Sequence, residues 1–527
     1  MQTPAQQTTP QAARTSWSNR FLIAAAAGIL FLTLYPFRFS LASKLPCNAS
    51  PFLLGSEKAD GALDIFLNIL LFVPFGFGLS EKLREAGRSW KSALAFTFLA
   101  GALFSYTIEF LQIYIPSRDS GWEDVCTNSA GAVAGFLLFQ GWGRQAVRGL
   151  THCELLLTNW LTSARTTAIV LLYLATWFAI SVPLQQKSLL TNWDPGNFLV
   201  LGNNAQAEYP WRGQLFRVQF WDRALSDRLA RELTRGSLDA AAGDGLVGDF
   251  DFSGPSPLHD RQNLLPDLVW TPRTPANAHA NSLVLDGDHW LVSQAPVSGF
   301  VRDVEKSNQF AVRVICMLAQ PAEGDKRIVS ISNSAGITNI TLRQEDANLV
   351  FWFRNPLSVK RSLLALYTPK VFGATARHDI LFSYDGSNLS LFIDGEQDSR
   401  AYQLGPGTTL AQLLIRVMPG ELDGYRYIYG ALVFLPAGVL LGFAARNWRS
   451  SPIATVALLT AGVCVPPAIL EWILVSVSGR TFSPANFVLS VLLLVAGVLW
   501  INADRPCDSM HPHCSIFNRA TKIPQIR

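Results

Sequence analysis

Charged residues, histidine and cysteine are all scarce in this chain of 527 residues. Asp, Glu, Lys and Arg make up 16% of the sequence and the net charge is only +4, with no basic cluster of the kind that binds nucleic acid. The seven histidines lie away from the acidic residues of the apolar segments, so no Ser-His-Asp arrangement is indicated. Nucleophile elbows, phosphate loops and metalloprotease helix motifs are absent too. The sequence therefore shows no catalytic centre of these classes.

Apolar residues are abundant instead, at 49% of the chain, and they gather in long runs at its two ends. A membrane helix needs about 20 mainly apolar residues. Eight segments meet this requirement, and they begin near Phe21, Leu63, Ser92, Thr127, Thr166, Tyr427, Ile453 and Phe487. The first run has no small-residue cleavage site, so we expect it to stay as a helix.

Lysine and arginine predict how this membrane protein is oriented. With the N-terminus inside, the inner segments hold fifteen of these residues and the short outer loops hold five, which obeys the positive-inside rule. The predicted domains are then a cytoplasmic tail (1–19), a membrane domain (20–184), a domain outside the cytoplasm (185–422), a C-terminal membrane unit (423–504) and a second cytoplasmic tail (505–527).

The seven cysteines define neither a disulfide framework nor a metal site. Cys316 alone falls in the polar middle of the chain, so that domain must be stable through its own core. Cys47 and Cys126 are both expected near the outer surface of the membrane, but two cysteines do not fix a pairing. The C-terminal tail carries zinc-type ligands at a cramped spacing, and we predict no metal site there: Cys507, His511, His513 and Cys514.

The middle domain has the pattern of an all-β fold. FLVLG (198–202) and QLFRVQFWD (214–222) are strand-like, and the alternation in FAVRVICML (310–318) has the period of a half-buried strand. The segment 378–397 predicts a hairpin around Asp-Gly-Ser-Asn and a second turn at Asp-Gly. LSDRLARELTRG (225–236) predicts one short helix that ends at a glycine.

The order of these strands resembles that of concanavalin A-like (laminin-G-like) jelly rolls over about residues 190–410. Such folds often bind sugars and some bind calcium, although the sequence contains no clear ligand pattern for either and no cofactor is predicted. Six tryptophans of this domain would either stack on sugar rings or, as aromatic residues commonly do, fill the core: Trp193, Trp211, Trp221, Trp270, Trp290 and Trp352.

Polar residues interrupt the apolar segments at three helix ends. They form pairs that share a helix face: Asp64 with Asn68, Glu109 with Gln112, and Asp124 with Asn128. In the predicted topology all three ends lie near the outer leaflet. Because intramembrane ionisable groups are costly, they normally face the bundle interior and mark function. The set is either a tie that neutralises Arg118 or a pocket open to the outer side.

This spacing, together with Pro74-x-Gly76, Gly131 and Gly135, resembles that of the VanZ-like family of bacterial membrane proteins over about residues 20–142. The resemblance implies a multi-pass protein of the bacterial inner membrane with a role in the cell envelope. The name-giving member is associated with resistance to the glycopeptide teicoplanin, but the family has no established reaction. Pro74 and Gly76 favour a kink or a close helix contact.

The chain also resembles itself at an offset of 362 residues. Without a gap, this offset aligns Pro74 with Pro436, Gly76 with Gly438, Glu109 with Glu471, and Arg118 with Arg480. Residues 423–504 are therefore predicted to be a degenerate, parallel repeat of 61–142, the alternative being chance similarity between membrane helices. The residues kept in both copies are assigned to a structural brace: Glu109, Arg118, Glu471 and Arg480. Those lost from the second copy are assigned to a ligand pocket: Asp64, Asn68, Gln112, Asp124 and Asn128.

Three functions follow as hypotheses. The first is an envelope protein that binds a glycan through the jelly roll and a lipid-linked or charged group through the polar pocket. The second is an enzyme that uses Asp64 and Asp124 as acid and base, since like charges raise the pKa of one partner. The third is an assembly protein with a protein partner. No catalytic residue is assigned, and nucleic acid is not expected as a partner.

Overall fold

The structure is a computed structural model that describes residues 17–35, 62–115, 120–236, 244–272, 282–319, 324–358, 364–373, 375–398, 402–415, 424–447 and 452–502. It divides into two compact units. Unit 1 comprises residues 1–170, 436–459 and 494–527, and unit 2 comprises residues 171–435 and 460–493. The predictions for Cys47, Arg118 and the tail 505–527 lie outside the described residues.

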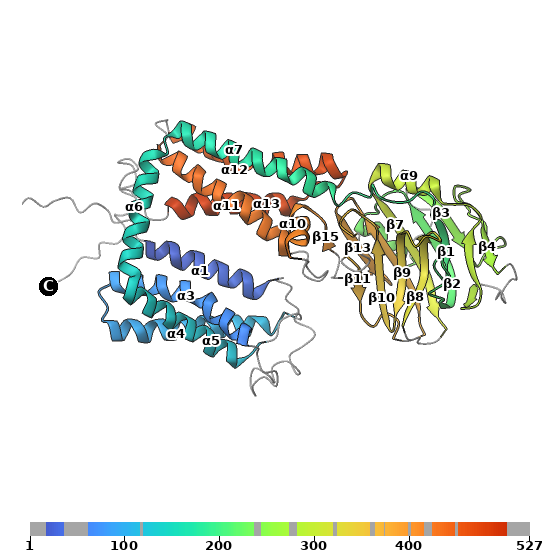
Figure 1. Cartoon of the computed structure of the whole chain (residues 1–527), viewed down its shortest axis with the longest axis horizontal. Helices are drawn as coiled ribbons and strands as arrows, with labels where there is room; N and C mark the ends of the chain where they lie inside the picture. The colour runs from blue at the N-terminus through green and yellow to red at the C-terminus, as the bar shows by residue number, and fades with distance from the viewer. Residues whose placement is uncertain are drawn as a thin grey trace, which may run out of the picture. The chain divides into compact units, whose positions relative to one another are not determined.

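Long apolar helices dominate both ends of the chain (Figure 1). Within the described residues, seven are long and apolar enough to cross a membrane: α1 (Trp17–Leu34), α3 (Ala62–Glu85), α4 (Trp90–Gln112), α7 (Ser163–Gln186), α11 (Gly424–Asn447), α12 (Pro452–Ser478) and α13 (Pro484–Asn502). The segment expected near Thr127 is helix α5 (Trp122–Leu138), which has 17 residues and is shorter than these. The chain is thus a polytopic helical membrane protein.

Unit 1 is built around contacts among α1, α3, α4 and α5. Ile29, Phe72 and Ile108 are almost fully buried and place one side chain each from α1, α3 and α4 in a shared apolar core. Helices α3 and α5 approach backbone to backbone, because a Cβ at Gly76 would overlap the carbonyl oxygen of Ala132. This is the close helix contact that the sequence predicted around Pro74 and Gly76.

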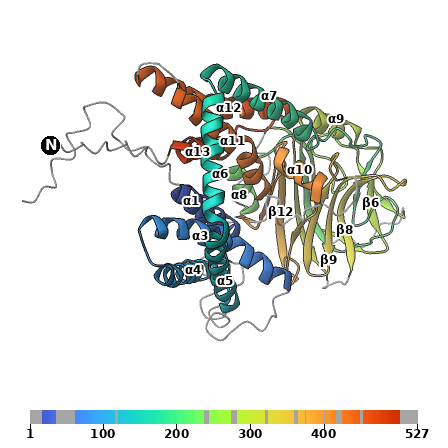
Figure 2. The ribbon, with the colours of Figure 1, turned by 60° about the vertical axis from the view of Figure 1, so that its left-hand side comes forward.

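Helix α6 (Arg144–Trp160) was not predicted from the sequence. It follows α5 through a π-helical turn, η1 (Phe139–Gly143), and runs crosswise to α3 and α4 (Figure 2). Glu154 of α6 forms a buried ion pair with Arg20 of α1, in which Glu154 Oε2 lies 2.8 Å from Arg20 Nη1. Arg20, which the topology prediction counted as an inner positive charge, is therefore neutralised inside unit 1.

Unit 2 contains a β domain made of two antiparallel sheets (Figure 1). One sheet has the order β11-β10-β9-β8-β1-β6-β4; the other has the order β14-β13-β12-β7-β2-β3, with β15 beside β13 and β5 beside β2. The strands are β1 (Phe198–Leu201), β2 (Arg212–Trp221), β3 (Leu246–Asp251), β4 (Leu268–Thr271), β5 (Leu283–Asp286), β6 (Trp290–Ser293), β7 (Phe310–Leu318), β8 (Asp325–Ser332), β9 (Thr338–Glu345), β10 (Asn348–Phe353), β11 (Leu366–Thr368), β12 (Arg377–Tyr384), β13 (Asn388–Ile393), β14 (Glu396–Gln397) and β15 (Tyr402–Gln403).

One apolar core joins the two sheets into a sandwich, which confirms the inserted β domain. Leu199 of one sheet and Leu215 of the other are both fully buried in it. The predicted hairpin is present, since β12 and β13 pair across the turn 385–387. The second turn is present as well, with Asp394 and Gly395 both in the left-handed region that a tight hairpin turn requires.

Three short helices accompany the sandwich: α8 (Asp227–Thr234), α9 (Ser298–Ser307) and α10 (Pro406–Ile415). Helix α8 is the one predicted from the sequence, and Ser226 caps its first turn. It covers the outer face of the second sheet, where Ala230 and Leu233 pack with Ala311 of β7. The prediction of a half-buried strand at 310–318 is therefore wrong, because β7 is buried on both faces.

Most tryptophans of the β domain belong to its interior. Four are at most 6% exposed: Trp193, Trp211, Trp221 and Trp352. Trp270 pairs with the core residue Leu291 across β4 and β6, so its ring faces the core. Trp290 points to the opposite face and is partly exposed. Trp221 and Trp352 are buried in separate clusters outside the core that joins the sheets. Of the two partly exposed tryptophans among the six candidates for sugar stacking, Trp290 is thus the one directed away from that core.

Candidate functional site

A cavity of about 770 Å³ lies among the first membrane helices in unit 1 and is called the first pocket. Its apolar wall comes from α1 and α3, and its polar residues come from α3, α4 and α5. The lining residues are Leu32, Thr33, Leu67, Asn68, Leu70, Leu71, Pro74, Glu109, Gln112, Asp124 and Asn128. Four of the five predicted pocket residues therefore meet in one cavity.

Hydrogen bonds fix the polar side chains of the first pocket. Asn68 Nδ2 donates to Asp124 Oδ1 at 2.5 Å, which ties α3 to α5. Gln112 Nε2 donates to the carbonyl oxygen of Thr33 at 2.9 Å, which ties α4 to α1. Asn128 Nδ2 donates to Ser105 Oγ at 2.9 Å. The amide nitrogens are thus used inside the protein.

Two oxygen atoms of these amides have no partner among the described residues. Gln112 Oε1 and Asn128 Oδ1 are both buried and accept no hydrogen bond there. The residues themselves are only 7% and 2% exposed. A buried polar atom without a partner costs roughly 1–3 kcal/mol, so such atoms are usually paired with water or a ligand.

Glu109 and Asp64 have different surroundings from the amides. Glu109 is 2% exposed, and its Oε2 accepts the backbone N–H of Gly121 at 3.0 Å. Asp64 lies in the first turn of α3, is exposed, and does not line the cavity. The structure therefore separates Asp64 from Asp124, its predicted partner in the pocket.

Sequence reasoning missed two partners that orient the pocket. Thr33 contributes its backbone carbonyl, which carries no residue-specific signal in a sequence. Ser105 lies in the middle of α4, seven residues before Gln112, and nothing in its neighbourhood distinguished it from other small residues of the helix. The apolar wall was also outside the prediction, since leucines in a membrane helix are expected everywhere.

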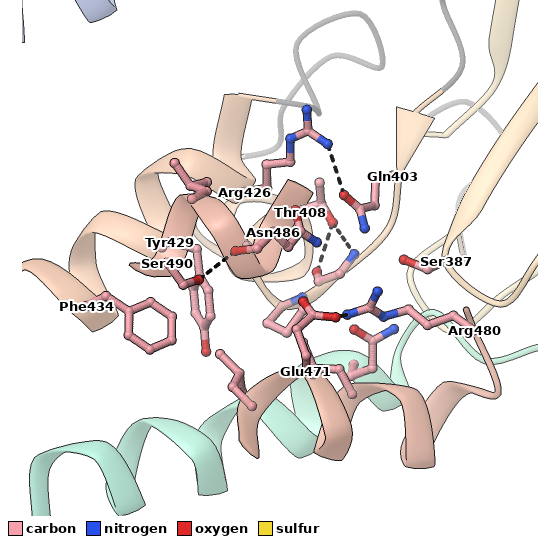
Figure 3. A pocket seen from close by; sticks show the side chains of 18 residues that line it. Ser387, Gln403, Thr408, Arg426, Tyr429, Phe434, Glu471, Arg480, Asn486 and Ser490 are labelled. Carbon is pink, nitrogen blue, oxygen red and sulfur yellow. Dashed lines mark hydrogen bonds and ion pairs between the residues drawn. The ribbon is translucent and has the colours of Figure 1, made fainter. Parts of the chain in front are cut away.

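A second cavity, called the second pocket, lies in unit 2 and measures about 60 Å³ (Figure 3). Its wall combines residues of α11, α12 and α13 with the start of α10 and two β-domain positions. The lining residues are Gln185, Ser387, Gln403, Gly405, Pro406, Gly407, Thr408, Arg426, Tyr429, Gly430, Phe434, Leu470, Glu471, Leu474, Arg480, Asn486, Leu489 and Ser490.

A buried ion pair forms one side of the second pocket. Arg480 Nη2 lies 2.6 Å from Glu471 Oε2, and both side chains are at most 6% exposed. The same carboxylate oxygen accepts the backbone N–H of Ser483 at 3.4 Å. Figure 3 shows the two charged groups facing each other, while Arg426 extends toward Gln403. The pair predicted as a brace is thus in direct contact.

The helices around the two pockets begin at matching residues. Helices α3 and α11 begin at 62 and 424, α4 and α12 at 90 and 452, and α5 and α13 at 122 and 484, a constant separation of 362. Six lining positions of the two pockets are related by the same offset: 67 and 429, 68 and 430, 109 and 471, 112 and 474, 124 and 486, and 128 and 490.

Specific contacts recur at this offset as well. Glu109 accepts from Gly121, and Glu471 accepts from Ser483, twelve residues later in each case. A Cβ at Gly76 would overlap the backbone of Ala132, and one at Gly438 would overlap that of Leu494. These agreements are backbone contacts, which do not follow from shared apolar composition.

Neither pocket has the make-up of a metal centre. Across the described residues, no group of three or more His, Cys, Asp or Glu side chains could hold a metal ion. The polar atoms of the first pocket are instead suited to hydrogen bonding, and its leucines to contact with hydrocarbon.

Comparison with known proteins identifies one part of the chain. Residues 4–143 match the protein-family model described as VanZ/LLP1. This match confirms the VanZ-like resemblance and spans α1, α3, α4 and α5, the helices that line the first pocket. No curated protein and no solved structure matches the chain.

Proposed function

We propose that this membrane protein, whose first 143 residues carry a VanZ-like domain, binds an amphiphilic component of the cell envelope and holds its polar part in the first pocket. One observation carries the proposal. The cavity of about 770 Å³ combines an apolar wall with two buried oxygen atoms, Gln112 Oε1 and Asn128 Oδ1, that lack partners among the described residues. Ligand sites commonly combine apolar walls with a few convergent polar groups.

The apolar wall supports an amphiphile rather than a purely polar ligand. Leu32, Leu67 and Leu70 line the cavity, and their side chains are 54%, 49% and 52% exposed, respectively. Side chains exposed on membrane helices contact lipid. A hydrocarbon chain can therefore lie along them while the attached polar group faces the polar residues of the lining.

The side of the membrane follows from the charge distribution. The positive-inside rule puts the N-terminus in the cytoplasm, so the pocket would lie near the outer leaflet of the bacterial inner membrane and residues 185–422 outside the cytoplasm. An envelope lipid or lipid-linked precursor reaches such a site. A link to glycopeptide resistance is part of the proposal and rests on the family resemblance alone.

The β domain is proposed to bind the glycan part of the same envelope material. Trp290 supports this role, since it is the partly exposed tryptophan that faces away from the core. Replacing Trp290 with Ala in the full chain should reduce retention on envelope polysaccharide, whereas replacing the exposed Tyr367 should not. Equal retention of wild type and Trp290→Ala would remove the glycan from the proposal.

Binding is favoured over catalysis by the position of the carboxylates. An acid–base mechanism was predicted for Asp64 with Asp124, but Asp64 is outside the cavity lining. A bell-shaped pH–rate profile on a lipid-linked substrate, abolished by Asp124→Asn, would instead establish the enzyme.

We further propose that α11–α13 are a degenerate second copy of α3–α5. The common offset of helix starts, pocket positions and backbone contacts supports this. In the second copy the amides are replaced by Leu474 and Ser490, and the cavity is far smaller. The first pocket is then the one that retains a ligand.

Native mass spectrometry of the full chain, extracted from membranes in mild detergent, tests the proposal. We expect an amphiphile to co-purify with wild type and to be lost in Gln112→Leu, which installs the residue of the second copy. The matched control is Ser490→Ala in the second pocket, which should leave the bound species unchanged. A wild-type protein that carries no amphiphile and is not stabilised by any fraction of an envelope lipid extract would refute the function.

A further inference from the structure

We propose that helix α6 lies in the plane of the membrane at its cytoplasmic surface and binds anionic phospholipids there. The proposed ligand of the first pocket is not involved, because α6 contributes no residue to that cavity. Three features of the helix support the proposal: the face by which it attaches to unit 1, an exposed apolar face, and a basic face on the remaining side.

The first face attaches α6 to the rest of unit 1. Glu154 is 7% exposed, and its Oε2 lies 2.8 Å from Arg20 Nη1 of α1. Thr151 is three residues before Glu154 and Thr158 is four residues after it, so both share this face, and both are partly buried. The ion pair therefore fixes which sides of α6 are turned away from the protein.

The second face is apolar and exposed. Leu156 and Leu157 precede Trp160 by four and three residues, so the three side chains lie on one side of the helix. They are 56%, 46% and 56% exposed, and Trp142 in the turn before α6 is 65% exposed. Such an apolar surface marks a contact with membrane or protein. Tryptophan is enriched at the boundary between lipid and water, and here it occurs just before α6 and at its last position.

The third face is basic. Arg144 and Arg148 are four residues apart and exposed, and neither has an ion pair among the described residues. Arg165, at the start of α7, is exposed too. Its Nη1 donates to the Trp160 carbonyl oxygen at 3.2 Å, and its guanidinium lies 5.8 Å from the centre of the Trp160 ring. The acidic residue of α6 is Glu154, which is already paired, so the exposed charge of the helix is positive.

The connections of α6 hold it at the surface of the membrane. It follows η1 without a break, and only Leu161 and Thr162 separate it from the membrane helix α7. It runs crosswise to α3 and α4, so the plane of a membrane that those helices cross is parallel to α6 (Figure 2). In the predicted topology this connection is cytoplasmic, the side on which short segments are rich in arginine and lysine.

The combination of an apolar and a basic face fits a lipid surface. An amphipathic helix of this kind buries its apolar face at the boundary between lipid headgroups and acyl chains. A protein partner would also cover apolar residues, but the arginines match the phosphate groups of a membrane. Each arginine near an anionic membrane raises the affinity by about fivefold. The occupant is therefore the anionic phospholipid of the cytoplasmic leaflet.

Two neighbouring leucines test the depth of α6 in the membrane. Leu156 and Leu155 are 56% and 58% exposed, but Leu155 follows Arg148 by seven residues and lies on the basic face. Leu156→Cys and Leu155→Cys are prepared in the full chain with the other cysteines replaced by serine. Each carries a spin label in nanodiscs of phosphatidylcholine and phosphatidylglycerol. The label at 156 should collide mainly with oxygen, which dissolves in lipid, and the label at 155 mainly with a water-soluble nickel chelate.

Two results of this experiment would overturn the lipid contact. Equal access of the nickel chelate to both labels would place the apolar face of α6 in water. Protection of the label at 156 from both reagents would mean that protein covers this face. Leu157→Cys provides the same measurement if Leu156→Cys does not fold.

The class of lipid is tested with a fluorophore on Leu156→Cys. Quenching by spin-labelled phosphatidylglycerol should require at least about fivefold less lipid than quenching by spin-labelled phosphatidylcholine. Arg144→Gln combined with Arg148→Gln should remove this difference, and about 0.5 M salt should reduce it by screening. The control combines Arg88→Gln with Lys91→Gln, which removes two exposed positive charges around the start of α4, and should keep the difference.

The lipid preference can fail while the position of α6 holds. If both spin-labelled lipids quench equally, the apolar face lies in the membrane but the anionic class is wrong. If the preference survives the loss of Arg144 and Arg148, these arginines do not bind the lipid. Neither result affects the proposed ligand of the first pocket, which is measured separately by its co-purification.

Discussion

The two three-helix segments, α3–α5 and α11–α13, have the same framework but different interiors. In both, a buried glutamate accepts the backbone N–H twelve residues later, and a glycine of the first helix contacts the backbone of the third. The polar residues between them differ, because Gln112 and Asn128 correspond to Leu474 and Ser490. The glutamate and glycine contacts are therefore common to both segments, whereas the amides are found in the first segment alone.

The contents of the two pockets differ in a related way. The second pocket is narrowed by the chain's own segment at the start of α10, where a Cβ at Gly407 would overlap the Tyr425 carbonyl. Arg426 also donates to Gln403 beside it, at 3.3 Å. In the first pocket no described segment occupies the equivalent space, and about 770 Å³ remains.

The largest effect is expected from the ion pair of the second copy. Glu471→Gln leaves the buried Arg480 without its carboxylate, which should lower the free energy of unfolding by roughly 3–5 kcal/mol. Thermal and denaturant unfolding in detergent measure this loss, with the exposed Glu123→Gln as control.

Glu109→Gln makes the same change in the first copy, so the losses in free energy of unfolding of the two variants can be compared directly. A loss of similar size in both variants supports one framework used twice. If Glu471→Gln unfolds at the wild-type temperature, the pair is not a brace and the division of residues between framework and ligand fails.

The glycine contacts should give the next largest effect. Gly76→Ala and Gly438→Ala each place a Cβ against a neighbouring backbone, so each should destabilise the protein by about 1–3 kcal/mol. Gly28→Ala in α1 is the control, because its added Cβ meets nothing within 4 Å. Unfolding of the three variants is compared in one detergent; a loss at Gly28 equal to that at Gly76 would show that the helix contacts are not responsible.

Residues that carry chemistry or turn geometry were the predictable part of this protein. The polar pairs led to four lining residues of the first pocket, and the Asp-Gly turns led to the hairpin at β12 and β13. Regular spacing and turn-forming residues act over a few positions, so they are visible in a sequence. The offset of 362 likewise anticipated where α11, α12 and α13 begin.

Features that depend on distant partners were not predictable. Helix α6 is strongly amphipathic but has no run of about 20 apolar residues, so its sequence does not indicate a membrane helix. The full burial of β7 depends on α8, which covers its second face. Asp64 shares a helix face with Asn68, yet the cavity ends before the first turn of α3. In each case tertiary packing decided the outcome.

A smaller effect on stability is expected when the amides of the first pocket are replaced by the residues of the second copy. Gln112→Leu and Asn128→Ser each lose the hydrogen bond that the amide nitrogen donates, which destabilises the folded protein. Each also removes a buried oxygen without a partner among the described residues, which stabilises it. Because the two effects oppose each other, the free energy of unfolding should change by less than about 1 kcal/mol. Unfolding in lipid-free detergent measures this change. A loss as large as that of Glu109→Gln would place these amides in the framework and break the distinction between the two segments.

The orientation of the two segments is tested without any effect on stability. A parallel repeat places the start of α5 and the start of α13 on the same side of the membrane, so Glu123→Cys and Ala485→Cys should both react with an impermeant maleimide added to intact cells. The native Cys153 of α6 should react only after permeabilisation, and the other cysteines are replaced by serine. Cys316 can remain, because it is buried and burial raises the pKa of its thiol to about 12. If the cysteine of the Ala485→Cys variant reacts only after permeabilisation, the repeat is inverted and not parallel. The two pockets would then face opposite leaflets, so they could not be compared as sites for one class of ligand.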